Sequence, residues 1–484
     1  MFEKVAGLVN LRYLASAIAV TSVLIAPPAM AAAEGLAING AHLSLAWVLP
    51  FAGILLSIAL GPLLVPNFWH HHFGKVSTGW VLVLLVPFGM TYGSSLVWFE
   101  VVHTLLLEYI PFIMLLLALF TVSGGIYVRG NLRGTPVVNT ALLALGTLLA
   151  SVMGTTGAAM LLIRPLIRAN DNRRHNVHVV VFFIFLVGNI GGSLTPLGDP
   201  PLFLGFLKGV DFFWTTKAMF LPMLFVSGIL LALFYAIDYF YFHHRDEELP
   251  KRLDPTPETK LRLEGGVNFL LLVAIVGAVL LSGFWKSGVE FDVMGIRLEL
   301  QHVTRDVLLL LIVGVSLKIT TKAVREANAF SWGPMLEVAK LFAAIFLTII
   351  PAIAILRAGS KGALAPVVAL VTGPSGAPNN AMYFWLTGAL SSFLDNAPTY
   401  LIFFNLAGAD AAVLMTTMSN TLLAISCGAV FMGANTYIGN APNFMIYAIA
   451  TSRGIKMPSF FGYMLWSGMI LLPLFAVMTV IFFR

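Results

Sequence analysis

The feature that most constrains this chain is a series of unbroken apolar runs, each about as long as a helix that crosses a bilayer. Strands of a membrane β-barrel would alternate apolar and polar residues instead. Only 10% of the residues are charged and 59% are hydrophobic, so a soluble or disordered chain is excluded. The predicted fold is an all-α polytopic membrane protein with about 10–11 transmembrane helices. Continuous spans are expected at about 45–66, 77–96, 101–127, 218–242, 266–285, 305–320, 335–357 and 459–482.

The charge balance indicates which loops face the cytoplasm. Lys and Arg number 28 against 22 Asp and Glu, a net charge of +6. In a membrane protein this excess is typical of basic cytoplasmic loops, and it does not require nucleic acid as a partner. We expect a multi-pass protein of the bacterial cytoplasmic (inner) membrane, with the lipid bilayer as its main partner.

The N-terminal residues 1–33 admit two interpretations. Lys4 and Arg12 precede an apolar stretch that ends in the small residues Ala29-Met30-Ala31. This pattern fits a cleaved signal peptide and equally a first transmembrane helix. Both interpretations leave the next residues outside the cytoplasm.

The first irregular region is apolar but has basic residues on both sides. Arg129 and Arg133 precede residues 136–168, and Arg173 and Arg174 follow them. Since both flanks should be cytoplasmic, the segment is predicted to be a re-entrant hairpin with its tip at Met153-Gly154-Thr155-Thr156-Gly157. The next span, 177–207, contains Gly191-Gly192-Ser193-Leu194-Thr195-Pro196-Leu197-Gly198-Asp199-Pro200-Pro201 and is predicted to be a broken helix.

A second hairpin and a second broken helix are expected further along. The hairpin covers 380–408 and has its tip at Leu394-Asp395-Asn396-Ala397-Pro398-Thr399. The broken helix covers 411–450 and is interrupted between Gly433 and Asn443. A polar loop at 243–265, cytoplasmic by the alternation of spans, separates the two parts of the chain.

These landmarks form an internal repeat. Thr195, Gly198 and Asp199 match residues that lie 241 positions later, namely Thr436, Gly439 and Asn440. Thr155 and Asn396 are also 241 apart, and Ile110-Pro111 matches Ile350-Pro351 at an offset of 240. The repeats are predicted to be 45–242 and 266–484. Counting the crossings gives them opposite orientations, an architecture typical of secondary transporters.

Carboxylates inside apolar spans are candidates for function, because burying a charge is costly. Asp199 and Asp395 are the two proton-carrying candidates, since a buried pair of acids can hold either a proton or a cation. A capping role at a helix start is the alternative for each. The full set of predicted ion- or substrate-binding residues is Thr155, Thr156, Asn189, Thr195, Gly198, Asp199, Asp395, Asn396, Thr399, Asn435, Thr436, Gly439, Asn440 and Asn443.

These motifs resemble those of the ion transporter superfamily, and more closely its sodium:proton antiporter and putative citrate transporter (CitMHS-like) branch. The resemblance covers about residues 45–482. It implies a homodimer in which hairpins and broken helices form the transport site and move against a scaffold. Dicarboxylate carriers of the superfamily have Ser-Asn-Thr at both tips, whereas here the tips are Gly154-Thr155-Thr156 and Asp395-Asn396-Ala397-Pro398-Thr399. Their dicarboxylate site therefore does not carry over intact.

Two functions remain in competition. The first is a sodium (cation):proton antiporter working by alternating access, which would transport Na⁺ and H⁺ and need no cofactor and no other metal. The alternative is a sodium- or proton-coupled symporter of citrate or another carboxylate. Arg164, on the return arm of the first hairpin, is the one fixed positive charge that the motifs offer to such an anion. The chain has no Walker A sequence and no catalytic triad spacing, so an enzyme is not expected. A single cysteine, Cys427, rules out an intramolecular disulfide.

Overall fold

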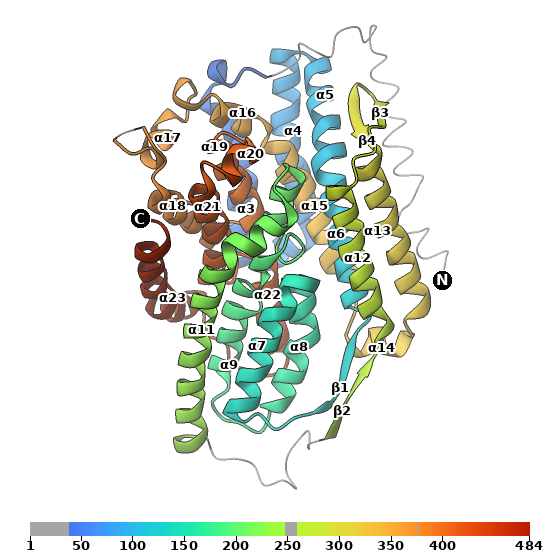
Figure 1. Cartoon of the computed structure of the whole chain (residues 1–484), viewed down its shortest axis with the longest axis vertical. Helices are drawn as coiled ribbons and strands as arrows, with labels where there is room; N and C mark the ends of the chain where they lie inside the picture. Colours follow the sequence, from blue (N-terminus) through green and yellow to red (C-terminus); the bar gives the residue numbers. More distant parts are fainter. Residues whose placement is uncertain (1–37, 247–258, 375) are drawn as a thin grey trace.

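The computed structural model describes residues 38–246, 259–374 and 376–484 of the chain. The predicted signal peptide or first helix at 1–33 lies outside these ranges, as does most of the predicted loop at 243–265. Within them the chain is almost wholly helical (Figure 1). The helices before the loop are α3 (Leu49–Leu64), α4 (Pro66–Tyr92), α5 (Ser94–Thr104), α6 (Ile110–Ser123), α7 (Pro136–Met153), α8 (Thr155–Ala169), α9 (Val177–Leu186), α10 (Pro200–Leu207) and α11 (Phe212–His244).

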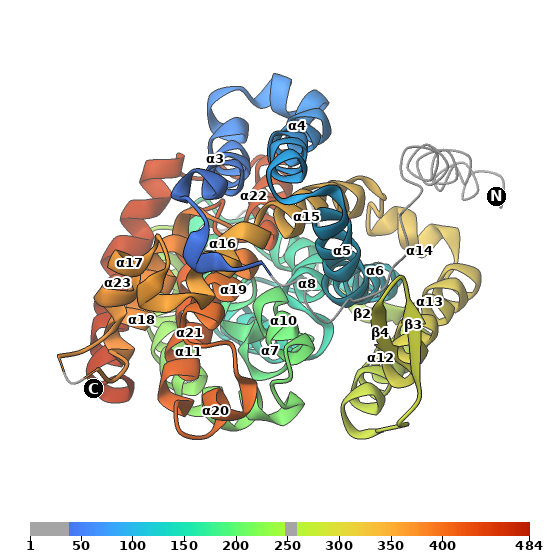
Figure 2. The same cartoon turned by 90° about the horizontal axis from the view of Figure 1, so that it is seen from above.

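The helices after the loop follow the same alternation of long and short pieces. They are α12 (Val267–Phe284), α13 (Leu300–Ile319), α14 (Lys322–Ala327), α15 (Gly333–Thr348), α16 (Ile350–Arg357), α17 (Ala365–Val371), α18 (Asn380–Phe393), α19 (Asn396–Leu406), α20 (Ala411–Met415), α21 (Ser419–Met432), α22 (Ala441–Ser452) and α23 (Phe460–Phe482). In Figure 2, α12, α13 and α14 lie at one edge of the molecule, and α17, α18 and α23 lie at the opposite edge.

The described ranges contain eight helices long and apolar enough to cross a membrane, and a ninth if the bent pair α15 and α16 counts as one span. This is fewer than the predicted 10–11. The segment at 1–33 lies outside the described ranges, and the break in the expected span at 411–450 leaves α21 with only 14 residues and α22 with only 12. Such helices are too short to cross a hydrocarbon core that needs about 20 residues.

Two short β-ribbons lie at opposite ends of the helices (Figure 1). β1 (Tyr127–Asn131) pairs antiparallel with β2 (Thr259–Glu264), with Tyr127 opposite Glu264. β3 (Glu290–Val293) pairs with β4 (Ile296–Glu299). The predicted loop at 243–265 is therefore not wholly irregular, because α11 extends to His244 and β2 occupies its last part. Strand β2 finds its partner 128 residues or more earlier in the chain, a pairing that no local pattern indicates.

The core is centred on α9, all but one of whose ten residues are buried. Its sequence is apolar on every side, which is typical of a helix surrounded by protein. Helices α7, α8, α11 and α22 all contact it. The break that follows α9 is thereby held inside the protein, where irregular backbone is tolerated at membrane depth.

Candidate functional site

The first break is built by small residues and prolines. After α9 the chain makes a short 3₁₀ turn, η5 (Ile190–Leu194), and then becomes extended at Thr195. Helix α10 restarts at Pro200, where the missing N–H costs nothing because the first turn of a helix has no partner for it. Asp199 stands just before this helix with φ −144° and ψ 140°.

The second break repeats this geometry. A 3₁₀ turn, η8 (Gly433–Asn435), follows α21, and Thr436 is extended. Helix α22 restarts with Pro442 in its first turn, and Asn440 precedes it with φ −155° and ψ 142°. Asn440 therefore occupies the backbone position that Asp199 has in the first break, 241 residues earlier.

Hydrogen bonds at the two breaks also recur at this spacing. In each break a threonine hydroxyl donates to the carbonyl of a hairpin serine, whose own hydroxyl donates to the carbonyl of a residue in or just before the 3₁₀ turn. The first set is Thr195 Oγ1 to Ser151 O (2.5 Å) and Ser151 Oγ to Gly191 O (2.5 Å). The second set is Thr436 Oγ1 to Ser392 O and Ser392 Oγ to Met432 O (3.1 Å). These hydrogen bonds thus hold each hairpin against the break that follows it in the chain.

Asp199 lies where both breaks and both hairpin tips meet. Its side chain is buried, with 1% exposure. The amide of Asn396, from the second tip, donates to Asp199 Oδ2 at 2.6 Å. Asn440 Nδ2 donates to Asp199 Oδ1 at 3.3 Å, and Thr155 Oγ1 donates to the same oxygen at 3.4 Å. Among the described residues no Lys, Arg or His forms an ion pair with this carboxylate, so its partners are all neutral.

A second layer of amides joins the two broken helices. Asn189 Nδ2 donates to Asn443 Oδ1 at 2.7 Å, and Asn440 Nδ2 lies 3.4 Å from Asn189 Oδ1. Asn443 in turn donates to the carbonyls of Gly433 and Thr436, at 2.8 and 2.9 Å. These contacts hold Asn440 beside Asp199.

Asp395 has a different environment from Asp199. It is half-buried, and its Oδ1 accepts a hydrogen bond from the backbone N–H of Ala397 at 3.1 Å. This is the capping interaction weighed as an alternative for both acids, and Asp199 does not make it although it also precedes a helix. The neighbouring Asn396 is fully buried, and its Oδ1 has no hydrogen-bond partner. An oxygen therefore stands free one residue from Asp395, on the side chain that contacts Asp199.

The predicted residues fall into two groups. Thr155, Asn396 and Asn440 contact the Asp199 carboxylate directly. Asn189 is connected to it through Asn440, and Asn443 through Asn189 and Asn440. The others shape backbone or line the nearby space. Gly198 accepts the Thr155 N–H (2.9 Å) and, like Gly439, lies against a glycine carbonyl; Thr399 bonds the Asp395 carbonyl (3.0 Å); and Asn435 bonds Ser392 (2.9 Å).

A cavity of about 110 Å³ opens beside this site. The first hairpin tip, including Thr156, lines one side of it together with Asp199. Apolar side chains of α6 and α15 line the other side. The cavity is large enough for an ion with a few waters, since a water in the liquid has a share of about 30 Å³.

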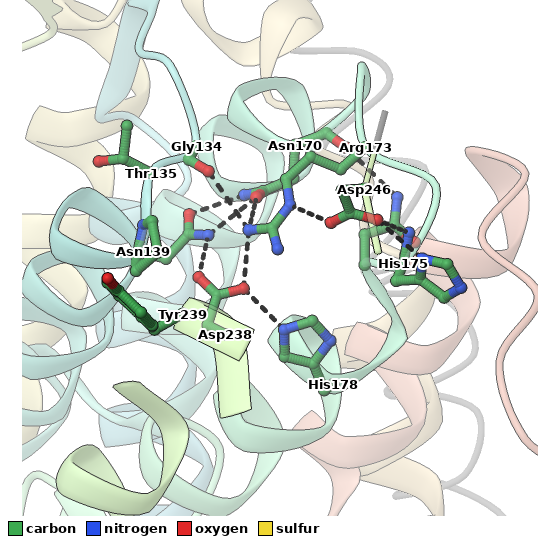
Figure 3. Close-up of polar contacts among 12 residues, drawn as sticks. Gly134, Thr135, Asn139, Asn170, Arg173, His175, His178, Asp238, Tyr239 and Asp246 are labelled. Atoms are coloured by element: carbon green, nitrogen blue, oxygen red, sulfur yellow. Dashed lines mark hydrogen bonds and ion pairs between the residues drawn. The ribbon is translucent and has the colours of Figure 1, made fainter. Parts of the chain in front are cut away.

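A polar cluster at the base of the first hairpin was not part of the predicted site (Figure 3). Asp238 of α11 is fully buried and pairs with Arg173 Nη1 and His178 Nε2, each at 2.7 Å. Asn139 of α7 donates to its other oxygen at 2.9 Å. An acid inside an apolar span was the signal that could have identified this cluster. Its hydrogen bonds fix the hairpin ends to α9 and α11.

The fold and the site define a class of protein. Apolar helices that cross a membrane, interrupted by paired breaks around a buried carboxylate, are the architecture of a membrane transport protein rather than an enzyme. Residues 40–483 match a family model described as putative citrate transport, so the chain belongs to that family. No curated protein matches the chain.

Proposed function

We propose that this protein is a secondary transporter that exchanges a monovalent cation, with sodium as the first candidate, for protons at Asp199. The observation that carries the proposal is the buried Asp199 carboxylate, whose hydrogen-bond donors are all neutral. An ionised carboxylate is costly to bury without a counter-charge. A proton or a cation would each remove that cost, and the two would compete for one position.

The surrounding oxygens support a cation as the second occupant. Asn396 Oδ1 is buried and unpartnered, and it belongs to the side chain that already contacts Asp199. Broken helices also expose backbone carbonyls, which in transporters coordinate Na⁺. We propose that Asp199, Asn396 and nearby carbonyls form the cation site. Asp395, which directly precedes Asn396 in the chain, is proposed as a second proton carrier.

Alternating access is proposed to arise from the two repeats. The hydrogen bonds that recur at a spacing of 241 residues support a repeat. In Figure 1, α7 and α8 lie toward the β1–β2 end, whereas α19 and α20 lie toward the opposite end, which supports opposite orientations. Movement of the hairpins and broken helices against α12, α13 and α15 would open the site to each side in turn. A homodimer in the bacterial inner membrane remains our expectation from the family resemblance.

The test is proton movement in everted membrane vesicles from cells that lack their own antiporters. A pH-sensitive dye reports collapse of a preformed proton gradient when sodium, lithium or potassium chloride is added. Sodium is expected to collapse the gradient in the wild type and not in Asp199→Asn. Gly228→Ala in α11 is the matched control, because an added methyl there meets nothing within 4 Å. No response of the wild type to any cation would contradict the proposal.

A carboxylate symporter is the second candidate, because the family description itself names citrate transport. It predicts sodium- or proton-dependent uptake of labelled citrate into right-side-out vesicles. An antiporter requires no organic solute. Citrate uptake without cation-driven proton exchange would favour the symporter.

A further inference from the structure

A second, larger cavity lies away from Asp199, toward the β3–β4 end of the molecule. Its volume is about 580 Å³. The walls come from the α5–α6 span, the end of α10, strand β4 and the first turns of α13. Unlike the smaller cavity, it is lined by several charged side chains.

Arg305 of α13 lines this cavity and has side-chain hydrogen-bond donors that no described residue accepts. Its side chain is 1% exposed, and its Nε donates to Asp306 Oδ1 at 2.8 Å. Nη1 and Nη2 are both buried and have no hydrogen-bond partner. Leaving a buried charged donor unsatisfied is costly, more so than leaving a neutral one. These two nitrogens are therefore the donors of Arg305 that no described residue satisfies.

The acids of the cavity already have partners. Glu108 forms an ion pair with Lys208. Glu299 accepts from Gln301 and lies 3.7 Å from His302 Nε2. Asp306 holds the Nε of Arg305. The buried hydrogen-bonding groups of the cavity wall that still lack a partner among the described residues are thus Nη1 and Nη2 of the positively charged Arg305. Such donors fit an anion and not a cation.

Helix α10 connects this cavity with the Asp199 site. Asp199 precedes the helix and Lys208 follows it. Between them, Phe203 lines the smaller cavity, and the Arg305 guanidinium lies 6.0 Å from the centre of its ring. The two cavities therefore adjoin opposite parts of one short helix, with Phe203 and Arg305 between them.

We propose that the Arg305 cavity binds a small organic anion through a carboxylate group seated on Nη1 and Nη2. A guanidinium presents two parallel N–H donors that match the two oxygens of a carboxylate, a geometry that Lys does not offer. The site is separate from the cation site at Asp199. It does not depend on cation:proton exchange. Strand β4 lines it, at the end of the molecule opposite β1 and β2 (Figure 1).

The experiment measures equilibrium binding of radiolabelled citrate to the purified full-length protein in choline buffer without sodium. Saturable binding is expected, with competition by unlabelled acetate at higher concentration. Arg305→Gln is expected to weaken citrate binding at least about tenfold, the loss of one charge-assisted contact of roughly 1.4 kcal/mol. Arg305→Lys keeps the charge and loses the fork, so an intermediate affinity is expected.

Matched variants separate binding from folding. Arg297→Gln removes another arginine of the same cavity, but one that is 74% exposed and 3.9 Å from Glu290, so citrate affinity should stay within about twofold. Asp306→Asn removes the competing acid and should leave binding equal or tighter. Each variant is first checked for a monodisperse elution profile, and if Arg305→Gln does not fold, Arg305→Lys decides.

Absence of saturable citrate binding to the wild type would overturn this inference. Unchanged affinity in Arg305→Lys and Arg305→Gln would also overturn it. Failure of the vesicle exchange assay with citrate binding retained would contradict the exchange function alone, and exchange without citrate binding would contradict the Arg305 site alone.

Discussion

The two broken helices have the same backbone but different charge. Asp199 and Asn440 precede their helices with nearly equal torsions, and the threonine and serine hydrogen bonds around them correspond one for one. Yet only the first position is ionisable, and the second supplies an amide that donates to it. The corresponding backbone therefore accounts for the shape of the site, while the difference between Asp199 and Asn440 places a single carboxylate between the two breaks.

Exchanging the two side chains is the strongest test of this comparison. Asp199→Asn alone should reduce sodium-driven exchange by at least about 100-fold, because a buried charge contact is worth roughly 3 kcal/mol or more. The double variant Asp199→Asn with Asn440→Asp restores one carboxylate on the other break. Exchange in vesicles should recover to within about tenfold of the wild type. No recovery would mean that the two positions are not equivalent in function.

Glycines at the two breaks test the shared backbone. An added Cβ would lie 2.1 Å from the Gly192 carbonyl oxygen in Gly198→Ala and 2.5 Å from the Gly433 oxygen in Gly439→Ala. Backbone atoms cannot move aside easily, so each variant should lose about 3 kcal/mol of unfolding free energy. Thermal unfolding of the purified protein measures this loss, and Gly228→Ala is the control. If only one of the two alanine variants loses unfolding free energy, the two breaks do not share the same close backbone packing.

The two acids next to the hairpin tips are expected to differ in effect. Asp395→Asn retains a side chain that can cap α19, so folding should be unchanged, whereas Asp395→Ala should cost about 1 kcal/mol. Because Asp395 is half-buried and capping, its Asn variant should lower exchange by about tenfold, less than Asp199→Asn. The same vesicle assay measures both. An equal loss of exchange in Asp395→Asn and Asp199→Asn would mean that the two acids contribute equally to exchange.

The smallest effect is expected at the paired threonines. Thr195→Val and Thr436→Val each remove a hydroxyl that donates to a serine carbonyl of the preceding hairpin. Each should lower the unfolding free energy by about 1 kcal/mol, and by similar amounts. Melting temperatures measured side by side would show whether the two hairpins are fastened equally.

Much of the fold could be predicted because Gly and Pro mark where a membrane helix ends. Helices α7 and α8 occupy 136–169 and are separated at Gly154, and α9, η5 and α10 lie within 177–207, so these helices end near the residues that the sequence marked. The re-entrant path of α7 and α8 stays a prediction. Helix α4 shows the limit. It begins at Pro66, well before the expected 77, since its first turns are polar and carry no hydropathy signal.

The chemistry of single residues was harder to predict than the elements. Asp199 could be chosen because an acid in an apolar run is unusual, but its contact with Asn396 joins residues 197 positions apart. Arg305 stood at the edge of an expected span, where a basic residue normally reaches water. Only the packing of α5, α6, α10 and β4 around it reveals that its terminal nitrogens are enclosed.

The β1–β2 ribbon has a mechanical consequence. Arg168, near the end of α8, donates to the carbonyls of Val128 and Gly130 in β1, at 2.9 and 3.2 Å. Strand β2 ends at Glu264, and α12 begins three residues later at Val267. The first hairpin is thus coupled to α12 through a short stretch of paired backbone. Any large displacement of the hairpin must either carry this ribbon along or break its bonds, so the ribbon sets how far the two parts can travel apart.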